Sequence, residues 1–286
     1  MKALPTLEGI EDAMALIRPH LEPTPLIRSE LLSRAMDAQV WIKNETVSPI
    51  ASFKMRGAIT DIERARQHRE LKGVVTASSG NHGQGVAMSA KLLGIRADIF
   101  LPTGANPGKV TMVKALGASV HMVAEHARLR TDARAFAIDN GLYYVDDGGS
   151  VDLMEGAGTV GLEVAHALPC VDLMFVPVGD AALINGSACA LKARHPNARV
   201  IAVQAARAPA LTESFQAGHS VERPANTIAD GLGTTEPAER ALAGMLTFVD
   251  DAVLVSEIDL LGALSACPGG DCNIVPYFVC DGFVGH

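Results

Sequence analysis

The chain has 286 residues, of which 48% are hydrophobic, and its formal net charge is -8. This length allows one large domain or two modest ones, and the acidic balance, with no basic stripe, argues against nucleic acid as a partner. The longest apolar runs are too short and too interrupted to span a bilayer, so no membrane partner is expected. The five cysteines form no C-x-x-C pair and no zinc-like spacing, which indicates free thiols in a reducing cytoplasm.

The first half of the chain predicts separate helices followed by a regular alternation of strands and helices. Helices are expected over 7–21, 29–36 and 55–69, with a short strand over 40–42. The alternation then predicts strands over 74–77, 97–101, 119–123 and 142–145, and helices over 84–93, 107–116 and 125–140. Each strand-helix step takes roughly 20 residues, which is typical of βα units in a parallel sheet.

A Gly- and Asp-rich segment, 146–150, marks a boundary, after which the alternation resumes. The pattern predicts helices over 158–168 and 183–194, and strands over 173–178, 199–203 and 253–255. Ser256 with Asp259 resembles the box of residues that opens a helix. Residues 206–240 are interpreted as irregular, and 277–279 as a short strand or a loose tail. The whole pattern indicates an α/β protein.

The segment 52–58, Ser-Phe-Lys-Met-Arg-Gly-Ala, holds the first candidate for chemistry. Lys54 stands among apolar and small residues, where desolvation would lower its pKa and free an amine to attack a carbonyl. That is the requirement for a Schiff-base lysine. The alternative is that Lys54 and Arg56 are ordinary solvated surface charges, which is the usual state of such a pair.

Three loops, 78–83, 104–108 and 179–182, lie at predicted carboxyl ends of strands, where doubly wound sheets bind ligands. The segment 78–85, Ser-Ser-Gly-Asn-His-Gly-Gln-Gly, combines hydroxyls, an amide and an imidazole, although these residues also favour ordinary turns. The loop at 179–182 begins with glycine and enters a helix, so it is a candidate phosphate cradle. Asp180 argues against that role, because a carboxylate 4 Å from a phosphate charge repels it by roughly 4 kcal/mol at an effective dielectric constant of 20.

Together, the segments 52–58 and 78–85 closely resemble the pyridoxal-phosphate (PLP) enzymes of fold type II, and more narrowly the threonine/serine dehydratase and serine racemase family. Further matches lie in the segments 23–26, 90–95, 114–118, 158–163 and 227–232. The resemblance implies a two-domain, tryptophan synthase β-like α/β fold with parallel sheets flanked by helices. Residues 1–72 and 148–286 would form the large PLP-binding domain, with an atypical C-terminal part, and 73–147 the small βα domain.

The resemblance also implies roles for individual residues. Lys54 would form the Schiff base with PLP and take the Cα proton of the substrate, while Ser79 would face the opposite side of the substrate, as in racemases. The cofactor would further contact Phe53, Asn81, Gly179, Asp180, Ala181, Ala182 and Leu183. The substrate carboxylate would bind to Ser78, Ser79, Gly80, Asn81 and His82. The implied reaction is β-elimination from a small hydroxy amino acid such as threonine or serine, giving a 2-oxo acid and ammonia, in a cytoplasmic homodimer.

Departures from the family pattern keep two other functions open. The phosphate loop is a run of glycines in the family, but here it carries Asp180 and two alanines. Racemase-like members hold an activating cation through a glutamate where this chain has Gln204, so no metal site is expected. The late segment that contacts the pyridine nitrogen is not evident after Ser265. The alternatives are an amino-acid racemase of the same family and a degenerate, non-catalytic relative that acts as a binding or regulatory protein.

Overall fold

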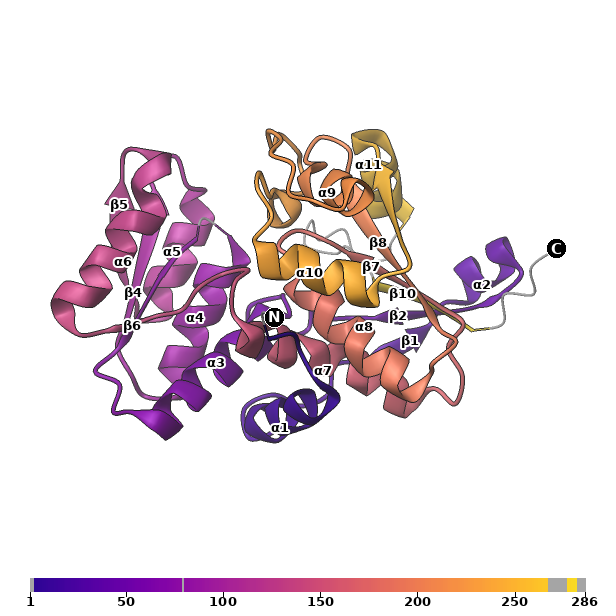
Figure 1. Ribbon diagram of the computed structural model, residues 1–286, viewed down its shortest axis with the longest axis horizontal. Coiled ribbons are helices and arrows are strands. Elements are labelled where there is room, and N and C mark those ends of the chain that lie inside the picture. Colours follow the sequence, from indigo (N-terminus) through magenta and orange to yellow (C-terminus); the bar gives the residue numbers. More distant parts are fainter. Residues whose placement is uncertain (1–2, 79, 267–276, 282–286) are drawn as a thin grey trace.

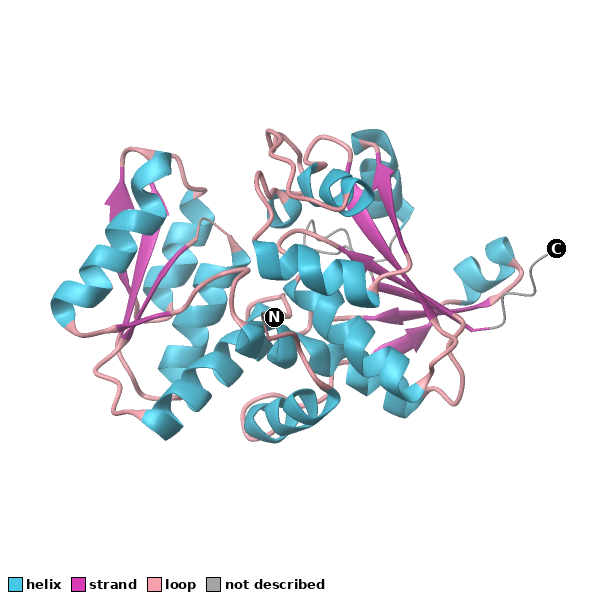
Figure 2. Cartoon of the chain, in the orientation of Figure 1, coloured by secondary structure: helices cyan, strands magenta, loops and turns pink. Residues whose placement is uncertain are grey.

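The computed structural model describes residues 3–78, 80–266 and 277–281. The chain forms two sheets, and each sheet is flanked by helices. The two sheets lie at opposite ends of the molecule (Figures 1 and 2). This arrangement confirms the α/β fold class. All four strands of the smaller sheet come from residues 74–144. The division of the chain into domains at residues 72 and 147 stays a prediction.

The smaller sheet is wholly parallel, as the alternating pattern predicted. Its strand order is β5-β4-β3-β6. The strands are β3 (Val74–Ala77), β4 (Ala97–Pro102), β5 (Ser119–Val123) and β6 (Tyr143–Tyr144). The helices between them are α4 (Asn81–Leu92), α5 (Pro107–Ala115), η1 (His126–Arg128) and α6 (Leu129–Asn140). Every residue of β3 is buried, which is why its sequence, Val-Val-Thr-Ala, does not alternate between apolar and charged residues.

The larger sheet is mixed, with the order β1-β2-β10-β7-β8-β9. Its strands are β1 (Leu26–Arg28), β2 (Gln39–Lys43), β7 (Leu173–Pro177), β8 (Arg199–Ala205), β9 (Asp251–Val255) and β10 (Tyr277–Asp281). The predicted parallel pairing holds for β7, β8 and β9, whereas β1 is antiparallel to β2, and β10 is antiparallel to both of its neighbours. Residues 29–38, which include the helix Glu30–Met36, join β1 to β2, and this connection is shorter than the dozen or more residues that a parallel crossover needs.

Several helices differ from the predicted ones. The remaining helices are α1 (Leu7–Ile17), α2 (Glu30–Met36), α3 (Lys54–His68), α7 (Val151–Ala167), α8 (Ala182–Arg194), α9 (Ala210–Ala217), η2 (Asp230–Leu232), α10 (Glu239–Phe248) and α11 (Glu257–Ala266). The helix expected at 158 begins seven residues earlier, because the Ser150 side chain accepts from the Leu153 N–H and caps it. The helix α9 and the 3-10 helix η2 lie in the region 206–240 that was interpreted as irregular, and α10 begins at its end. The Ser256 and Asp259 pair forms the predicted box.

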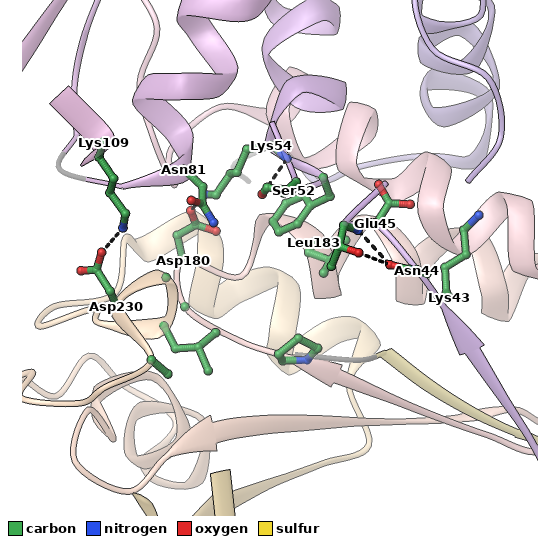
Figure 3. Close-up of a pocket in the computed structure, with 18 of the residues that line it drawn as sticks. Lys43, Asn44, Glu45, Ser52, Lys54, Asn81, Lys109, Asp180, Leu183 and Asp230 are labelled. Carbon is green, nitrogen blue, oxygen red and sulfur yellow. Dashed lines mark hydrogen bonds and ion pairs between the residues drawn. The ribbon is translucent and has the colours of Figure 1, made fainter. Parts of the chain in front are cut away.

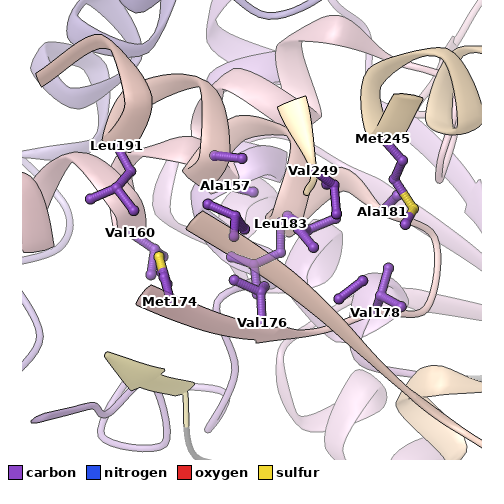
Figure 4. Packing of buried hydrophobic residues seen from close by; sticks show 14 of the residues in the cluster. Ala157, Val160, Met174, Val176, Val178, Ala181, Leu183, Leu191, Met245 and Val249 are labelled. Carbon is purple, nitrogen blue, oxygen red and sulfur yellow. The ribbon is translucent and has the colours of Figure 1, made fainter. Parts of the chain in front are cut away.

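The main core packs α7 and α8 against β7 and β8 (Figure 4). The two helices cross with their backbones in close contact. A Cβ added at Gly186 would lie only 2.6 Å from the Cα of Gly158, so both positions require glycine. Among the described residues, no helix is long and apolar enough to cross a membrane.

Candidate active site

A cavity of about 310 Å³ lies between the elements that surround the smaller sheet and those of the larger sheet (Figure 3). It is lined by the start of α3, by the first residue of α4 and by the loop that enters α8. The residues on these three elements are Ser52, Phe53, Lys54, Asn81, Gly179, Asp180, Ala181 and Leu183. The cavity is also lined by residues 42–46, Ala51, Pro177, residues 228–232 and Asn106 with Lys109. The volume is that of a small-molecule site.

Lys54 is the first residue of α3, and its side chain is 14% exposed. Its Nζ atom donates a hydrogen bond to Asp147 Oδ1 at 3.1 Å and another to Asp180 Oδ2. It also lies 5.6 Å from the centre of the Phe53 ring. The structure thus places the predicted Schiff-base lysine inside a cavity, between two carboxylates that come from distant parts of the chain.

The predicted lowering of the Lys54 pKa is wrong for the chain in this state. Burial does act to lower that pKa, but the charges and hydrogen bonds of Asp147 and Asp180 outweigh it, so the pKa is raised. Although burial opposes ionisation of Asp147, His82 and Lys54 lower its pKa. Burial raises the pKa of Asp180, and the adjacent Asp147 carboxylate adds to the rise. Lys54 is therefore an ammonium group in this arrangement.

Asp180 also caps the helix that follows it. Its Oδ1 atom accepts a hydrogen bond of 3.0 Å from the Ala182 N–H, at the first residue of α8. Ala181 between them adopts the left-handed conformation, with φ 65°, which is unusual for a residue that has a Cβ. The loop expected to cradle a phosphate is thus closed by its own carboxylate.

The residues that follow β3 lie partly at the cavity and partly in the protein interior. Asn81 lines the cavity, whereas His82 turns away from it and is buried, with Nε2 3.1 Å from Thr76 Oγ1 and Nδ1 3.3 Å from Asp147 Oδ1. Burial lowers the His82 pKa, so its imidazole is neutral. Ser78 and Gly80 do not line the cavity; the Ser78 Oγ atom accepts from the Gly80 N–H. Ser79 lies outside the described residues.

Arg56, two residues after Lys54, is not the surface charge that the alternative interpretation required. Its side chain is 1% exposed and donates to Glu45 Oε2 at 2.8 Å and to Glu163 Oε1 at 2.9 Å. Lys43, equally buried, pairs with Glu163 Oε2 at 2.6 Å. This network ties α3 to β2 and α7, and it thereby fixes the end of α3 that carries Lys54.

Residues 17–267 match the family described as "Pyridoxal-phosphate dependent enzyme". The chain belongs to this family of pyridoxal-phosphate-dependent enzymes. Its curated relatives in the family include the catabolic L-threonine dehydratase of Staphylococcus aureus, which is 37% identical over 262 residues, covering 91% of this chain and 76% of that protein.

Solved structures of other family members superpose closely on this chain. The serine racemase of maize has a TM-score of 0.89 at 31% identity, covering 93% of this chain and 81% of that chain. The processed threonine deaminase isoform 2 of Solanum lycopersicum has a TM-score of 0.84 at 31% identity, covering 90% of this chain and 76% of that chain. These likenesses confirm the fold type II resemblance drawn from the segments 52–58 and 78–85.

The cavity of this PLP-dependent enzyme fits the aldehyde and ring of its cofactor. It offers an amine at Lys54, an amide at Asn81 and an aromatic wall at Phe53. A Cβ at Gly85 would lie 3.0 Å from the Lys54 carbonyl carbon, so glycine lets α4 pack against the lysine backbone. The acidic side chain of Asp180 fits a phosphate poorly, because both are anions.

Sequence reasoning missed Asp147, Lys109 and Asp230 as site residues. Asp147 follows a predicted strand, so the rule that ligands bind at carboxyl ends of strands could have found it. Lys109 on α5 pairs with Asp230 in η2 at the cavity wall, a contact that no local pattern indicates. Within the described ranges, no cluster of three His, Cys, Asp or Glu could hold a metal ion. Gln204 Oε1 accepts from the Thr212 N–H at 2.8 Å, and the predicted absence of a cation there stays a prediction.

Proposed function

We propose that this protein catalyses the PLP-dependent β-elimination of a small hydroxy amino acid such as threonine or serine, giving a 2-oxo acid and ammonia. The observation that carries the proposal is the 37% identity to an L-threonine dehydratase, together with a lysine amine placed inside a cavity of suitable size. The amino acid would lose its Cα proton and its β-hydroxyl as water. It would take water back as its nitrogen leaves as ammonia, so the atoms balance.

The residues that line the cavity would have different roles in the reaction. PLP, when bound, supplies an electron sink that stabilises negative charge at Cα. Lys54 would bond to the cofactor and exchange the proton at Cα, and Phe53 and Asn81 would hold the ring. Before its amine can bond to a carbonyl, Lys54 Nζ must lose a proton. Asp147 Oδ1 and Asp180 Oδ2 accept hydrogen bonds from that atom and hold it as an ammonium group, so the proton would leave to water.

Borohydride reduction in the presence of PLP tests the role of Lys54. We expect the cofactor to become fixed to the peptide that contains Lys54, and 2-oxobutanoate to form from L-threonine. Lys54→Ala should lose both the fixed cofactor and the elimination activity. Lys91→Ala, at an exposed position of α4, is the matched control and should keep both. Labelling at another lysine, or no labelling of the wild type, would contradict the proposal.

An amino-acid racemase is the second candidate, favoured by the close superposition on maize serine racemase. Its second proton-transfer residue would be Ser79, as the resemblance implies. Chiral chromatography after incubation with L-serine separates the two functions. Pyruvate without D-serine supports elimination, and D-serine in excess of pyruvate supports racemisation. The absence of both products with PLP bound would favour the non-catalytic alternative.

The homodimer and the cytoplasmic location are also proposals. Exposed apolar side chains on β1 and α2 support self-association: Ile27 is 49%, Leu31 69% and Met36 45% exposed. Light scattering should give the mass of two chains, and Leu31→Asp should shift it to one if this surface forms the interface. The Cys189 thiol is in no disulfide, which suits a reducing compartment, and cell fractionation tests the location.

A further inference from the structure

The carboxylate of Asp180 makes two contacts that a phosphate of the cofactor would need to share or displace. Oδ1 accepts from the Ala182 N–H at the start of α8, and Oδ2 pairs with Lys54. A helix N-terminus attracts anions because its first N–H groups have no partner within the helix. In this chain an anion already occupies that position, and it belongs to the protein.

The surroundings of Asp180 carry more negative than positive charge. The groups that face it are Lys54, Asp147 and, beyond Asp147, the imidazole of His82, which burial keeps neutral. Two carboxylates therefore share one ammonium in a site where Asp180 and Asp147 are each 21% exposed. A phosphate brings nearly two further negative charges close to them. Burial limits the screening of that repulsion by water and salt.

We propose that Asp180 determines how this site distinguishes phosphorylated from non-phosphorylated pyridoxal, because its carboxylate stands where the phosphate binds. The inference rests on cofactor binding at Lys54, which is part of the proposed function. The ring and aldehyde of the two ligands are the same, and only the phosphate differs. The Asp180 carboxylate therefore reduces the gain in affinity that the phosphate gives to PLP. The affinities for pyridoxal and PLP are closer to each other than they would be in a loop without this carboxylate.

The affinity ratio of PLP to pyridoxal isolates this effect. Replacing Asp180 also frees Lys54 from an ion pair, but that change acts on the aldehyde of both ligands and cancels in the ratio. In Asp180→Asn the side-chain oxygen can still accept from Ala182, so the helix cap is kept and only the charge is lost. In Asp180→Gly the charge and the cap are both lost, so the Ala182 N–H becomes available to the ligand.

Both dissociation constants are measured on the purified cofactor-free protein at low salt, by absorbance titration and equilibrium dialysis. We expect the preference for PLP to rise about tenfold in Asp180→Asn, which corresponds to about 1.4 kcal/mol, and at least as much in Asp180→Gly, since the repulsion between the carboxylate and the phosphate is removed. The matched control is Asp147→Asn, which removes the other carboxylate on Lys54 and leaves the α8 cap intact. Its ratio should change clearly less.

The outcomes separate this inference from the proposed function. An unchanged ratio in Asp180→Asn, with both ligands still forming an adduct at Lys54, overturns the role of Asp180 and leaves the enzyme proposal standing. An equal change in Asp147→Asn also overturns it, because it shows a general charge effect. Failure of the wild type to bind either ligand overturns the enzyme proposal itself. Melting temperatures of the three variants show that each is folded.

Discussion

The substitution Asp61→Asn should stabilise the protein increasingly as the pH rises. Asp61 lies on α3, is 1% exposed, and accepts a hydrogen bond of 2.6 Å from Ser150 Oγ. Burial raises its pKa to about 6 against the opposing effect of that hydrogen bond, whereas the unfolded value is 3.8. The folded state therefore holds a proton that the unfolded state releases between these values. The resulting contribution to stability is lost as the pH rises, and ionised Asp61 costs about 3 kcal/mol above pH 6.

The pH dependence of the difference between the variant and the wild type is the quantity to measure. About half of the cost is already present at pH 5, so urea unfolding should show the advantage of Asp61→Asn growing by roughly 1.5 kcal/mol between pH 5 and pH 7.5. Any pH-independent effect of the new amide cancels in this comparison. A constant difference, or one that shrinks as the pH rises, would show that Asp61 is not held in its acid form and would refute the reasoning.

Three further changes test the fold and the site. In a urea titration, Gly186→Ala should lower the unfolding free energy by about 3 kcal/mol, because its Cβ would clash with the backbone of α7. The control Gly262→Ala, at an open position of α11, should be neutral or slightly stabilising in the same titration. Arg56→Met should lower the unfolding free energy by roughly 3–5 kcal/mol, since it leaves the buried Glu45 without its cation and Glu163 without one of its cations, and a loss under 1 kcal/mol would contradict this. Treatment with a chelator should leave activity and melting temperature unchanged, and recovery of lost activity by Mg²⁺ would show that a metal site was overlooked.

Local patterns predicted those parts of the fold that local chemistry determines. The bounds of β3 follow from its buried apolar run, and α11 begins where Ser256 and Asp259 close a capping box. The pattern did not reveal α10, because Pro237 lies two residues before it and its buried face depends on contact with α8. The strand β1 was missed for a similar reason: three residues carry no period, and only pairing with β2 defines them.

At the site, too, local patterns did not predict effects of charged residues that are distant in the sequence. The sequence located Lys54 and the loop at 179–182, because lysine, glycine and strand-end positions are local signals. The sequence predicted a lowered pKa for Lys54, because the flanking residues are apolar. The pKa is raised instead, because the charges that decide it come from Asp147 and Asp180, which are 93 and 126 positions away. It could not show either that the Asp180 carboxylate turns back onto the first N–H of its own helix.

The close crossing of α7 and α8 has a consequence for how the cavity can open. Asp147 lies four residues before α7 and Asp180 two residues before α8, so the two carboxylates are mounted on helices whose backbones touch. Helices in such contact cannot slide or hinge past each other without a clash. The wall of the cavity that carries Asp180 is therefore expected to keep its position when a ligand enters. The Asp180 carboxylate cannot retreat from an incoming phosphate unless the crossing of α7 and α8 is disrupted.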